Sequence, residues 1–272
     1  MDLNSAIDLV WKNRQRGIYY PGALNGILSL DDAYRVNLAI SQRLISGGEK
    51  QAGWKVGVTA KAMQEQMGVH QPVFGVLFES GHRDSGVELK FADLIEPSVE
   101  NELCLTIGKT LRGPGVSIAQ TRASIASVAP ALEIVERRGV FSDLPLAMAD
   151  NAQQKYCVCA KAMPWPGSPG LAAGLGPEPM ALGHPVFMRL SEASVEVFLN
   201  GVSQEIASGA EVMGDPIASV TWLANKLAEF DLALEAGMRV MSGSFTKQYR
   251  IKPGDRIESR FTPFGVVSAR FP

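Results

Sequence analysis

The chain has 272 residues, of which 46% are hydrophobic and 20% charged, and its formal charge is −2 from 26 basic and 28 acidic residues. This composition is typical of a soluble globular protein with one large domain, or one domain with a smaller attachment, and it excludes overall disorder. Charges of both signs are scattered without a basic stripe, and no apolar run reaches 18 residues. We therefore expect no nucleic-acid partner, no membrane span and no signal peptide, and a cytoplasmic location.

The first 50 residues predict two helices. Apolar residues recur at helical spacing from Leu3 to Trp11, and a second helix is expected from Leu30 to the glycine pair at 47–48, with two aspartates in its first turn. A short strand, "GWKVGVT" at 53–59, and a short helix at 60–68 follow. From "VFGVLFE" at 73–79 onward the pattern is dominated by strands.

The middle of the chain predicts two long buried segments. The stretch 96–107, "EPSVENELCLTI", has the character of a buried strand, and a turn is expected at 113–115. A helix is expected over 117–128, leading into the apolar run 129–138, "APALEIVERR". The Pro/Gly-rich stretch 162–185 predicts a long irregular connection of the kind that is often functional.

The last third predicts a hairpin, one amphipathic helix and closing strands. Asn200 and Gly201 supply the hairpin turn within 193–209. The helix 215–231 begins with Asp215 as its N-cap and Pro216 in its first position. Strands are expected at 239–245, 249–261 and 265–271. Short strands interrupted by single helices indicate an α+β fold with a mixed, strongly curved sheet.

Three glutamates form the strongest functional pattern. Side chains alternate along a strand, so Glu100 and Glu102 share one face with Cys104, while Glu133 lies inside the apolar "PALEIV". Burying such a charge without compensation would cost several kcal/mol. Together the three carboxylates would form an oxygen site for Mg²⁺ or Mn²⁺ with coordination positions open for substrate. The alternative is a solvated Glu-x-Glu pair, with Glu133 meeting Arg137 or Arg138.

Other polar residues are open to two interpretations each. Lys55, bracketed by Gly53 and Gly57, is either a surface lysine or a partly buried proton shuttle. The small-residue segment at 242–244 is either a plain turn or a holder for a substrate carboxylate. The histidines at 70, 82 and 184 lie in loop-like sequence without evident partners. A zinc site needs about four ligands, and the sequence shows no second cysteine pair and no histidine cluster that would complete one around Cys157 and Cys159. These two cysteines and Cys104 are therefore interpreted as reduced packing thiols.

Several segments, taken in order, resemble one family. "GWKVGVTAKAMQEQMGVHQPVFGVLF", "EPSVENELCL", "PALEIVERR", "ADNA", "FLNG" and "SGSFT…KPGDRI…GVVSARF" look like the 2-keto-4-pentenoate hydratase and 4-oxalocrotonate decarboxylase group of the fumarylacetoacetate hydrolase superfamily. The resemblance covers about residues 50–272. It implies a C-terminal β-roll catalytic domain, placed at 76–272, and a smaller N-terminal helical α/β portion, placed at 1–75. It also implies dimers or larger homo-oligomers, and association with a related pathway enzyme.

The resemblance also implies roles for individual residues. Glu100, Glu102 and Glu133 correspond to the ligands of Mg²⁺ or Mn²⁺, and Lys55 to a catalytic lysine, with Glu79 as a second proton carrier. The substrate-binding residues are expected to be Asp150 of "MADNA" and four members of the late segment. Those four are Ser242, Ser244, Phe245 and Lys247.

Three departures from the family pattern concern the substrate and the reaction rather than the metal. Ser80 stands where many members carry an acid, Gln153 and Gln154 follow "ADNA", and Asp215 replaces the usual histidine before the late helix.

The resemblance implies a lyase of aromatic ring-cleavage catabolism acting on a small 2-oxo or 2-hydroxy-dienoic acid. A hydratase would protonate C5 of a 2-hydroxy-2,4-dienoate and add water at C4 to give a 4-hydroxy-2-oxo acid. A decarboxylase would act on 2-oxo-3-enedioates, whose second carboxylate could meet Lys247 or Arg250. Acylpyruvate carbon–carbon hydrolysis would need a His-Glu pair, which the sequence does not indicate, and a non-catalytic partner subunit is the remaining alternative.

Overall fold

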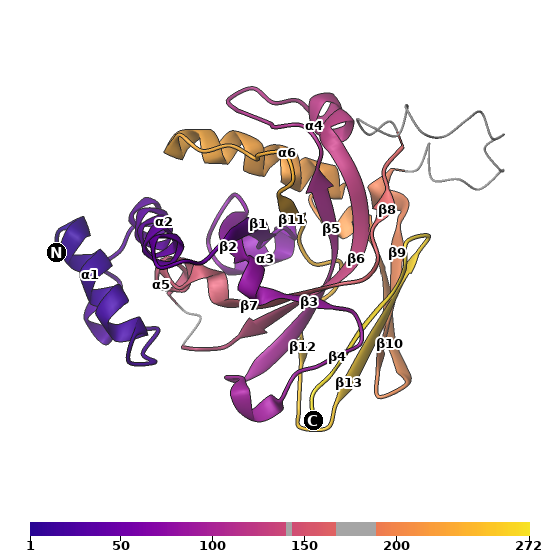
Figure 1. Ribbon diagram of the computed structural model, residues 1–272, viewed down its shortest axis with the longest axis horizontal. Helices are drawn as coiled ribbons and strands as arrows, with labels where there is room; N and C mark the ends of the chain where they lie inside the picture. Colours follow the sequence, from indigo (N-terminus) through magenta and orange to yellow (C-terminus); the bar gives the residue numbers. More distant parts are fainter. Residues whose placement is uncertain (140–142, 167–188) are drawn as a thin grey trace.

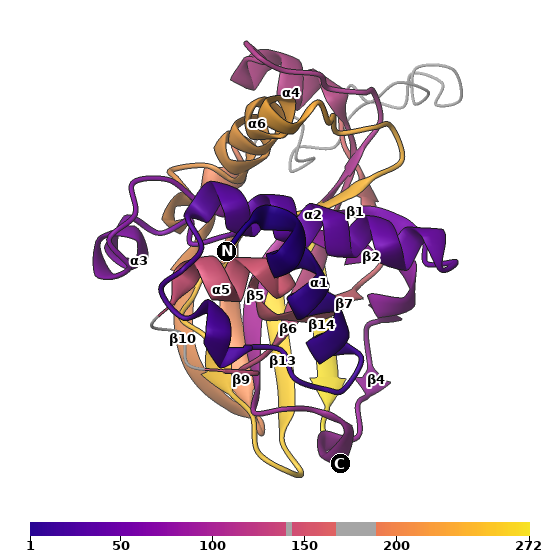
Figure 2. The same ribbon diagram turned by 90° about the vertical axis from the view of Figure 1, so that its left-hand side faces the viewer.

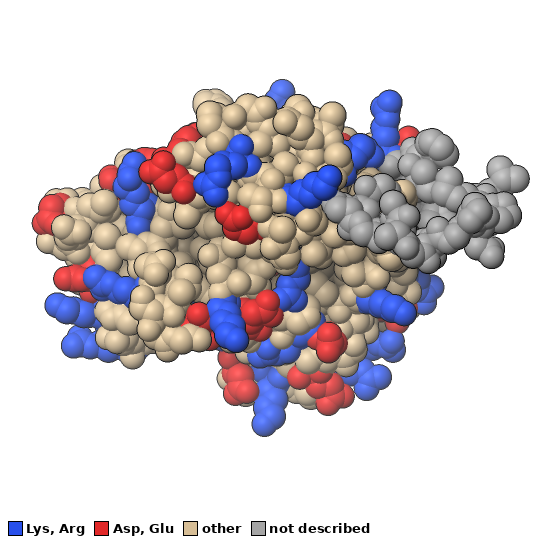
Figure 3. All heavy atoms as spheres, turned by 45° about the horizontal axis from the view of Figure 1, so that its top comes forward, with Lys and Arg blue, Asp and Glu red and all other residues tan. Residues whose placement is uncertain are grey.

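The computed structural model describes residues 1–139, 143–166 and 189–272 (Figure 1). Most of the Pro/Gly-rich stretch expected to be irregular, from residue 167 on, lies outside the described residues. None of the helices in these ranges combines the length and the apolar character that a membrane span needs. Lys and Arg alternate with Asp and Glu over the face drawn in Figure 3.

Helices and strands follow one another along the whole chain. The α-helices are α1 (Leu3–Arg14), α2 (Leu30–Ser46), α3 (Lys61–Gln66), α4 (Ile118–Ser124), α5 (Leu144–Ala149) and α6 (Pro216–Leu227). The strands of the first half are β1 (Gln51–Gly57), β2 (Val73–Phe78), β3 (His82–Asp84), β4 (Val87–Glu88), β5 (Pro97–Ile107) and β6 (Ile125–Glu136). Those of the second half are β7 (Gln154–Cys159), β8 (Met163–Pro164), β9 (Ser194–Leu199), β10 (Val202–Ser208), β11 (Arg239–Met241), β12 (Tyr249–Arg250), β13 (Arg256–Thr262) and β14 (Gly265–Arg270).

The strands form two sheets. A nine-stranded mixed sheet runs in the order β2-β1-β11-β5-β6-β7-β3, with β12 beside β5 and β8 beside β6. The second sheet has the order β10-β9-β13-β14-β4. The long strands β5 and β6 are the centre of the larger sheet, which curls strongly in Figure 1. The α+β fold with a mixed, curved β-roll is therefore confirmed.

Each helix covers a definite part of this roll. Figures 1 and 2 place α1, α2 and α5 together beside β1 and β2, whereas α4 and α6 pack together above them, with α6 also in contact with β1. The start of α2 is fixed by a capping box between Ser29 and Asp32. Asp215 accepts a hydrogen bond from the Ile217 N–H at the start of α6, as its N-cap position predicts.

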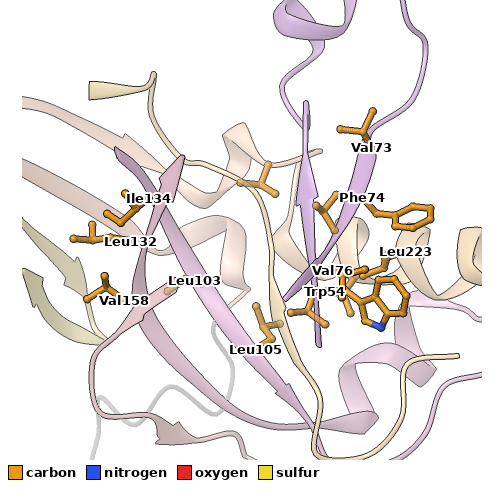
Figure 4. Close-up of a cluster of buried hydrophobic side chains, with 14 of the residues drawn as sticks. Trp54, Val73, Phe74, Val76, Leu103, Leu105, Leu132, Ile134, Val158 and Leu223 are labelled. Carbon is orange, nitrogen blue, oxygen red and sulfur yellow. The ribbon is translucent and has the colours of Figure 1, made fainter. Parts of the chain in front are cut away.

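The two faces of the central strands carry different side chains. One face bears large aliphatic residues, among them Leu103, Leu105 and Leu132, which belong to the main hydrophobic core (Figure 4). The opposite face carries Glu100, Glu102 and Cys104 in alternation, as expected from the strand period of two. Its apolar part is a separate buried cluster of small and sulfur-containing residues: Ala52, Leu77, Cys104, Ala129, Ala131, Cys157, Cys159 and Met241.

Two expectations need comment. The helix expected over 117–128 ends at Ser124, because β-branched Ile125 and Val128 already belong to β6. The boundary expected between residues 75 and 76 falls inside β2, and β1 pairs with β11, so the larger sheet includes strands from both portions. The division into two portions stays a prediction.

Candidate metal centre

The three glutamates converge because β5 and β6 pair in an antiparallel register. Glu100 lies directly opposite Glu133, and Glu102 lies two residue pairs further along on the same face, opposite Ala131. One carboxylate oxygen from each glutamate lies within 4.8 Å of the other two. Glu102 and Glu133 are fully buried, whereas Glu100 is partly exposed. The solvated alternative for this set is therefore wrong.

Lys55 on β1 provides the counter-charge at this centre. Its Nζ lies 3.3 Å from Oε1 of Glu133, and both side chains are buried. The arginine alternative for Glu133 is wrong, since Arg138 instead contacts Glu136 and Asp150. One ammonium facing three carboxylates leaves an excess of two negative charges in a buried place.

The polar contacts of the carboxylates leave room for a cation. The Gly243 N–H donates to Oε2 of Glu102 at 2.8 Å, and Gln248 Nε2 donates to Oε1 of Glu100 at 2.9 Å. Oε1 of Glu102 is buried and has no hydrogen-bond partner within the described ranges. An orphaned carboxylate oxygen among oxygen donors fits a hard divalent cation such as Mg²⁺ or Mn²⁺.

The pKa values report the same charge imbalance. Burial raises the pKa of Glu133 to about 8; the Lys55 ammonium opposes that rise and Glu100 adds to it. Burial and the neighbouring Glu133 and Glu100 raise the pKa of Glu102 well above its ordinary value. For Lys55, burial disfavours the ammonium, but the carboxylates, Glu133 foremost, outweigh burial and raise its pKa. Lys55 is thus protonated when the site is ionised.

A small cavity opens beside the metal centre. Its polar lining includes Lys55, Glu100 and Gln248, the last of which the sequence analysis missed. The remaining wall is largely apolar. The residues of this wall come from β2, β6, the end of β1, α5 and the turn after α5. Its apolar members are Val58, Val73, Val135, Leu144, Ala147, Met148 and Ala152. Gln153, in the turn after α5, also lines the cavity.

The late segment contributes to the site through its backbone. Gly243 has a φ of +108°, and a Cβ there would lie 2.5 Å from the Thr59 side chain, so only glycine brings this N–H to Glu102. Ser244 Oγ accepts from the Asn101 N–H, and Phe245 packs edge-on against Phe261.

The other members of that segment also lie away from the cavity. The Ser242 side chain is buried, and Lys247 is exposed with its Nζ 5.8 Å from the centre of the Tyr249 ring. None of the four side chains named from the sequence, at 242, 244, 245 and 247, lines the cavity.

Two further residues expected in the site have other partners. Glu79 follows the end of β2 on the surface, where its carboxylate pairs with Arg239 at 2.5 Å, and this contact holds its pKa below the ordinary value. Asp150 is buried in a network with Arg138 at 2.7 Å and Arg14 at 3.2 Å. The structure therefore does not bring either side chain to the carboxylates.

A curled mixed sheet that presents three converging carboxylates and a buried lysine defines a β-roll protein with a divalent-metal site. The family model described as fumarylacetoacetate (FAA) hydrolase C-terminal matches residues 51–271, and the chain belongs to this family.

Relatives with assigned reactions fall into two groups. The chain is 33% identical over 250 residues to a 2-hydroxyhexa-2,4-dienoate hydratase of Comamonas testosteroni, covering 90% of this chain and 87% of the relative. It is 32% identical over 246 residues to a 4-oxalocrotonate decarboxylase of Pseudomonas putida, covering 90% and 86%. A structure of 4-oxalocrotonate decarboxylase from Pseudomonas putida G7, complexed with magnesium and adipate, matches with a TM-score of 0.86 and 27% identity over 100% of this chain and 99% of that one.

Proposed function

We propose that this protein is a divalent-metal-dependent hydratase that adds water to a 2-hydroxy-2,4-dienoate with an apolar far end, giving a 4-hydroxy-2-oxo acid. Relatives named as hydratases of such dienoates support the reaction class. The observation that carries the choice of hydratase is the apolar wall of the cavity beside the three glutamates. Mg²⁺ is the ion we propose, because the ligands are carboxylates and a related decarboxylase is complexed with magnesium.

Charge at the far end separates the proposed uncharged dienoate from diacid substrates, which include the 2-oxo-3-enedioate of a decarboxylase and the dioate in the name of one related hydratase. A 2-oxo-3-enedioate carries a second carboxylate, which would need a cation in the cavity wall. Among the described lining residues the only cationic side chain is Lys55, which already faces Glu133. Lys247 and Arg250, the cations considered from the sequence, are exposed, and Arg250 pairs with Glu96. An uncharged dienoate tail therefore fits this cavity better than a carboxylate.

The chain's own residues would orient the substrate and move protons. Glu100, Glu102 and Glu133 would hold the cation, which when bound supplies Lewis-acid stabilisation of negative charge on the substrate's 2-oxygen. Lys55, protonated and lining the cavity, is placed to deliver the proton that C5 takes up as the 2-hydroxyl loses its own. Once Lys55 has regained a proton, its ammonium would deliver a second proton, to C3, as the water oxygen adds at C4. Substrate plus one water then equals product.

Turnover of two substrates tests this proposal. We expect 2-hydroxypenta-2,4-dienoate to lose its chromophore in Mg²⁺, with no loss in EDTA or in Glu102→Gln, and no release of CO₂ from 2-oxohex-3-enedioate. CO₂ release faster than dienoate hydration would instead establish a decarboxylase, the alternative favoured by the structural match to that enzyme.

A matched pair of wall variants sharpens the assay. Met148→Lys places a cation in the apolar wall and should lower KM for the enedioate, whereas Met148→Leu should leave the preference for the uncharged dienoate unchanged. Equal KM values for the enedioate in the two variants would contradict the role assigned to the wall.

A further inference from the structure

A second group of metal-ligating side chains lies at the edge of the larger sheet. The short strand β3 pairs in parallel with β7, and this register sets His82 beside Cys157. One ligand atom from each of His82, Cys157 and Cys159 lies within 4.8 Å of the other two. The two Sγ atoms are 3.3 Å apart. No spacing in the sequence indicates this cluster, because the histidine and the cysteines belong to distant strands.

The surroundings of this cluster are rich in sulfur, with one exposed carboxylate, Asp84, 3.7 Å from His82 Nε2, and with Glu133 opposite Cys157 on the neighbouring strand β6. Cys157 Sγ lies 3.2 Å from Met241 Sδ, and Cys104 belongs to the same buried cluster. Alanines at 52, 129 and 131 complete the buried cluster. An imidazole with two thiols is a donor set for a thiophilic d¹⁰ cation and a poor one for Mg²⁺.

His82 gives an independent indication that this cluster binds a ligand. Its Nδ1 is buried and finds no hydrogen-bond partner in the part of the chain that the structure describes. A buried imidazole nitrogen without a partner costs roughly 1–3 kcal/mol, and plain packing of thiols gives no reason for that cost. The side chain as a whole is 28% exposed, so the histidine brings the cluster close to the protein surface.

The sulfur geometry favours a metal over a disulfide. Residues two apart on a strand have Cα atoms about 6.6 Å apart, at the long end of the range of about 4.4–6.8 Å that a disulfide spans. A tetrahedral zinc ion with Zn–S bonds of about 2.3 Å holds its sulfurs about 3.8 Å apart. The observed 3.3 Å between the thiols needs only small side-chain rotations to reach that spacing.

We propose that His82, Cys157 and Cys159 form a second metal site that binds one thiophilic d¹⁰ cation such as Zn²⁺ and leaves the fourth tetrahedral position to water. The ion would link the three-residue edge strand β3 to β7. Its role is to stabilise the sheet edge, separately from the carboxylate centre that would take the hard cation. This inference does not depend on the proposed hydratase reaction.

Cadmium titration tests the site directly. The full-length protein is reduced, stripped with chelator, dialysed, and saturated with Mg²⁺ to fill the carboxylate centre before Cd²⁺ is added. We expect an ultraviolet sulfur-to-cadmium charge-transfer band that saturates at one equivalent per chain and is displaced by Zn²⁺. The band should be lost in Cys159→Ser and its affinity lowered by at least about 10-fold in His82→Gln. Zn²⁺ should raise the Tm of the wild type more than that of His82→Gln.

Two control variants make the outcome decisive. His70→Gln changes an exposed loop histidine in the same way, and Glu102→Gln disables the carboxylate centre; both should keep the cadmium band. His82 is partly exposed, and Mg²⁺ binding by His82→Gln verifies that this variant is folded. Absence of the band in the wild type, saturation well beyond one equivalent, or unchanged affinity in His82→Gln would overturn the proposal and leave the thiols as packing residues.

Discussion

Neutralising Glu102 should stabilise the metal-free protein while abolishing metal binding. Glu102 is fully buried beside Glu100 and Glu133, and only Lys55 opposes the three charges. In Glu102→Gln the amide oxygen can still accept the Gly243 N–H, so the local hydrogen bond survives the loss of charge. A substitution that disables the site is therefore expected to raise the free energy of unfolding of the metal-free chain.

The size of the effect follows from the distances. Two like charges at 4.8 Å repel by about 3 kcal/mol at an effective dielectric constant near 20. The substitution removes two such repulsions and one attraction to Lys55, and with the attraction taken as equal in size the net relief is about 3 kcal/mol. Proton uptake by the cluster already relieves part of it, so we expect about 1–3 kcal/mol, or a Tm several degrees higher.

This difference in stability can be measured by thermal unfolding of both proteins, with and without Mg²⁺. The pH is kept above 8, the approximate pKa of Glu133, so that Glu133 is ionised. Magnesium at about 100 times its Kd should stabilise the wild type by about 2.7 kcal/mol and the variant hardly at all, which reduces or reverses the order of stability. Glu65→Gln, the same change at an exposed position, should shift stability by less than about 0.5 kcal/mol. A metal-free Glu102→Gln protein less stable than the wild type, or equal stabilisation of both by Mg²⁺, would refute the reasoning.

Four further predictions follow from the site and its support. Lys55→Met should lower kcat by about 10²–10⁴-fold while calorimetry still detects Mg²⁺ binding, and unchanged kcat would remove the lysine from proton transfer. Because the pKa of Glu133 is raised, its contribution to the stability of the metal-free fold is complete below the ordinary carboxyl pKa and is lost as pH rises through about 8. Mg²⁺ needs the ionised form, so its affinity should rise with pH up to about 8 and then level off in calorimetric titrations; a flat profile would contradict this assignment. Gly243→Ala should weaken Mg²⁺ binding, because a Cβ would lie 2.5 Å from Thr59 and displace the N–H from Glu102, whereas exposed Gly86→Ala should leave the Kd unchanged. Arg138→Ala should cost up to about 3–5 kcal/mol in urea unfolding, because it removes the buried cation shared by Glu136 and Asp150 and leaves them only the partly exposed Lys155 and Arg14; a cost below about 1 kcal/mol would show that the network is dispensable.

The convergence of the three glutamates was predictable from the sequence because it depends largely on local periodicity. Two glutamates two residues apart on one strand must share a face, and Glu133 within an apolar run had to be compensated. The β5–β6 register then follows from one antiparallel pairing of two long strands. The curved α+β fold was likewise predictable from the order of its elements and from the family resemblance.

The remaining parts depend on tertiary contacts that leave no sequence pattern. Ser80 stands at the family's acidic position and Glu79 was expected to replace that acid, yet β2 ends before Glu79 and Arg239 reaches it at the surface. Gln248 is an ordinary exposed glutamine whose role appears only when its amide meets Glu100. The pairing of His82 with Cys157 rests on a three-residue parallel strand, which is too short to predict. Assembly into homo-oligomers and association with a pathway enzyme stay predictions.

The cation ligands and the cavity wall come from different parts of the chain. The three glutamates are fixed on the two central strands, whereas much of the apolar wall belongs to α5 and the turn that follows it, both short and outside the sheet. Under the proposed function, substitutions at Leu144, Ala147 or Met148 would change the accepted substrate tail and leave the geometry of the three carboxylates unchanged. Because the carboxylates and much of the wall lie on separate elements, few substitutions would be needed to change a preference for uncharged dienoates into one for diacids. This separation also marks these three positions as the natural starting point for a library aimed at new substrates.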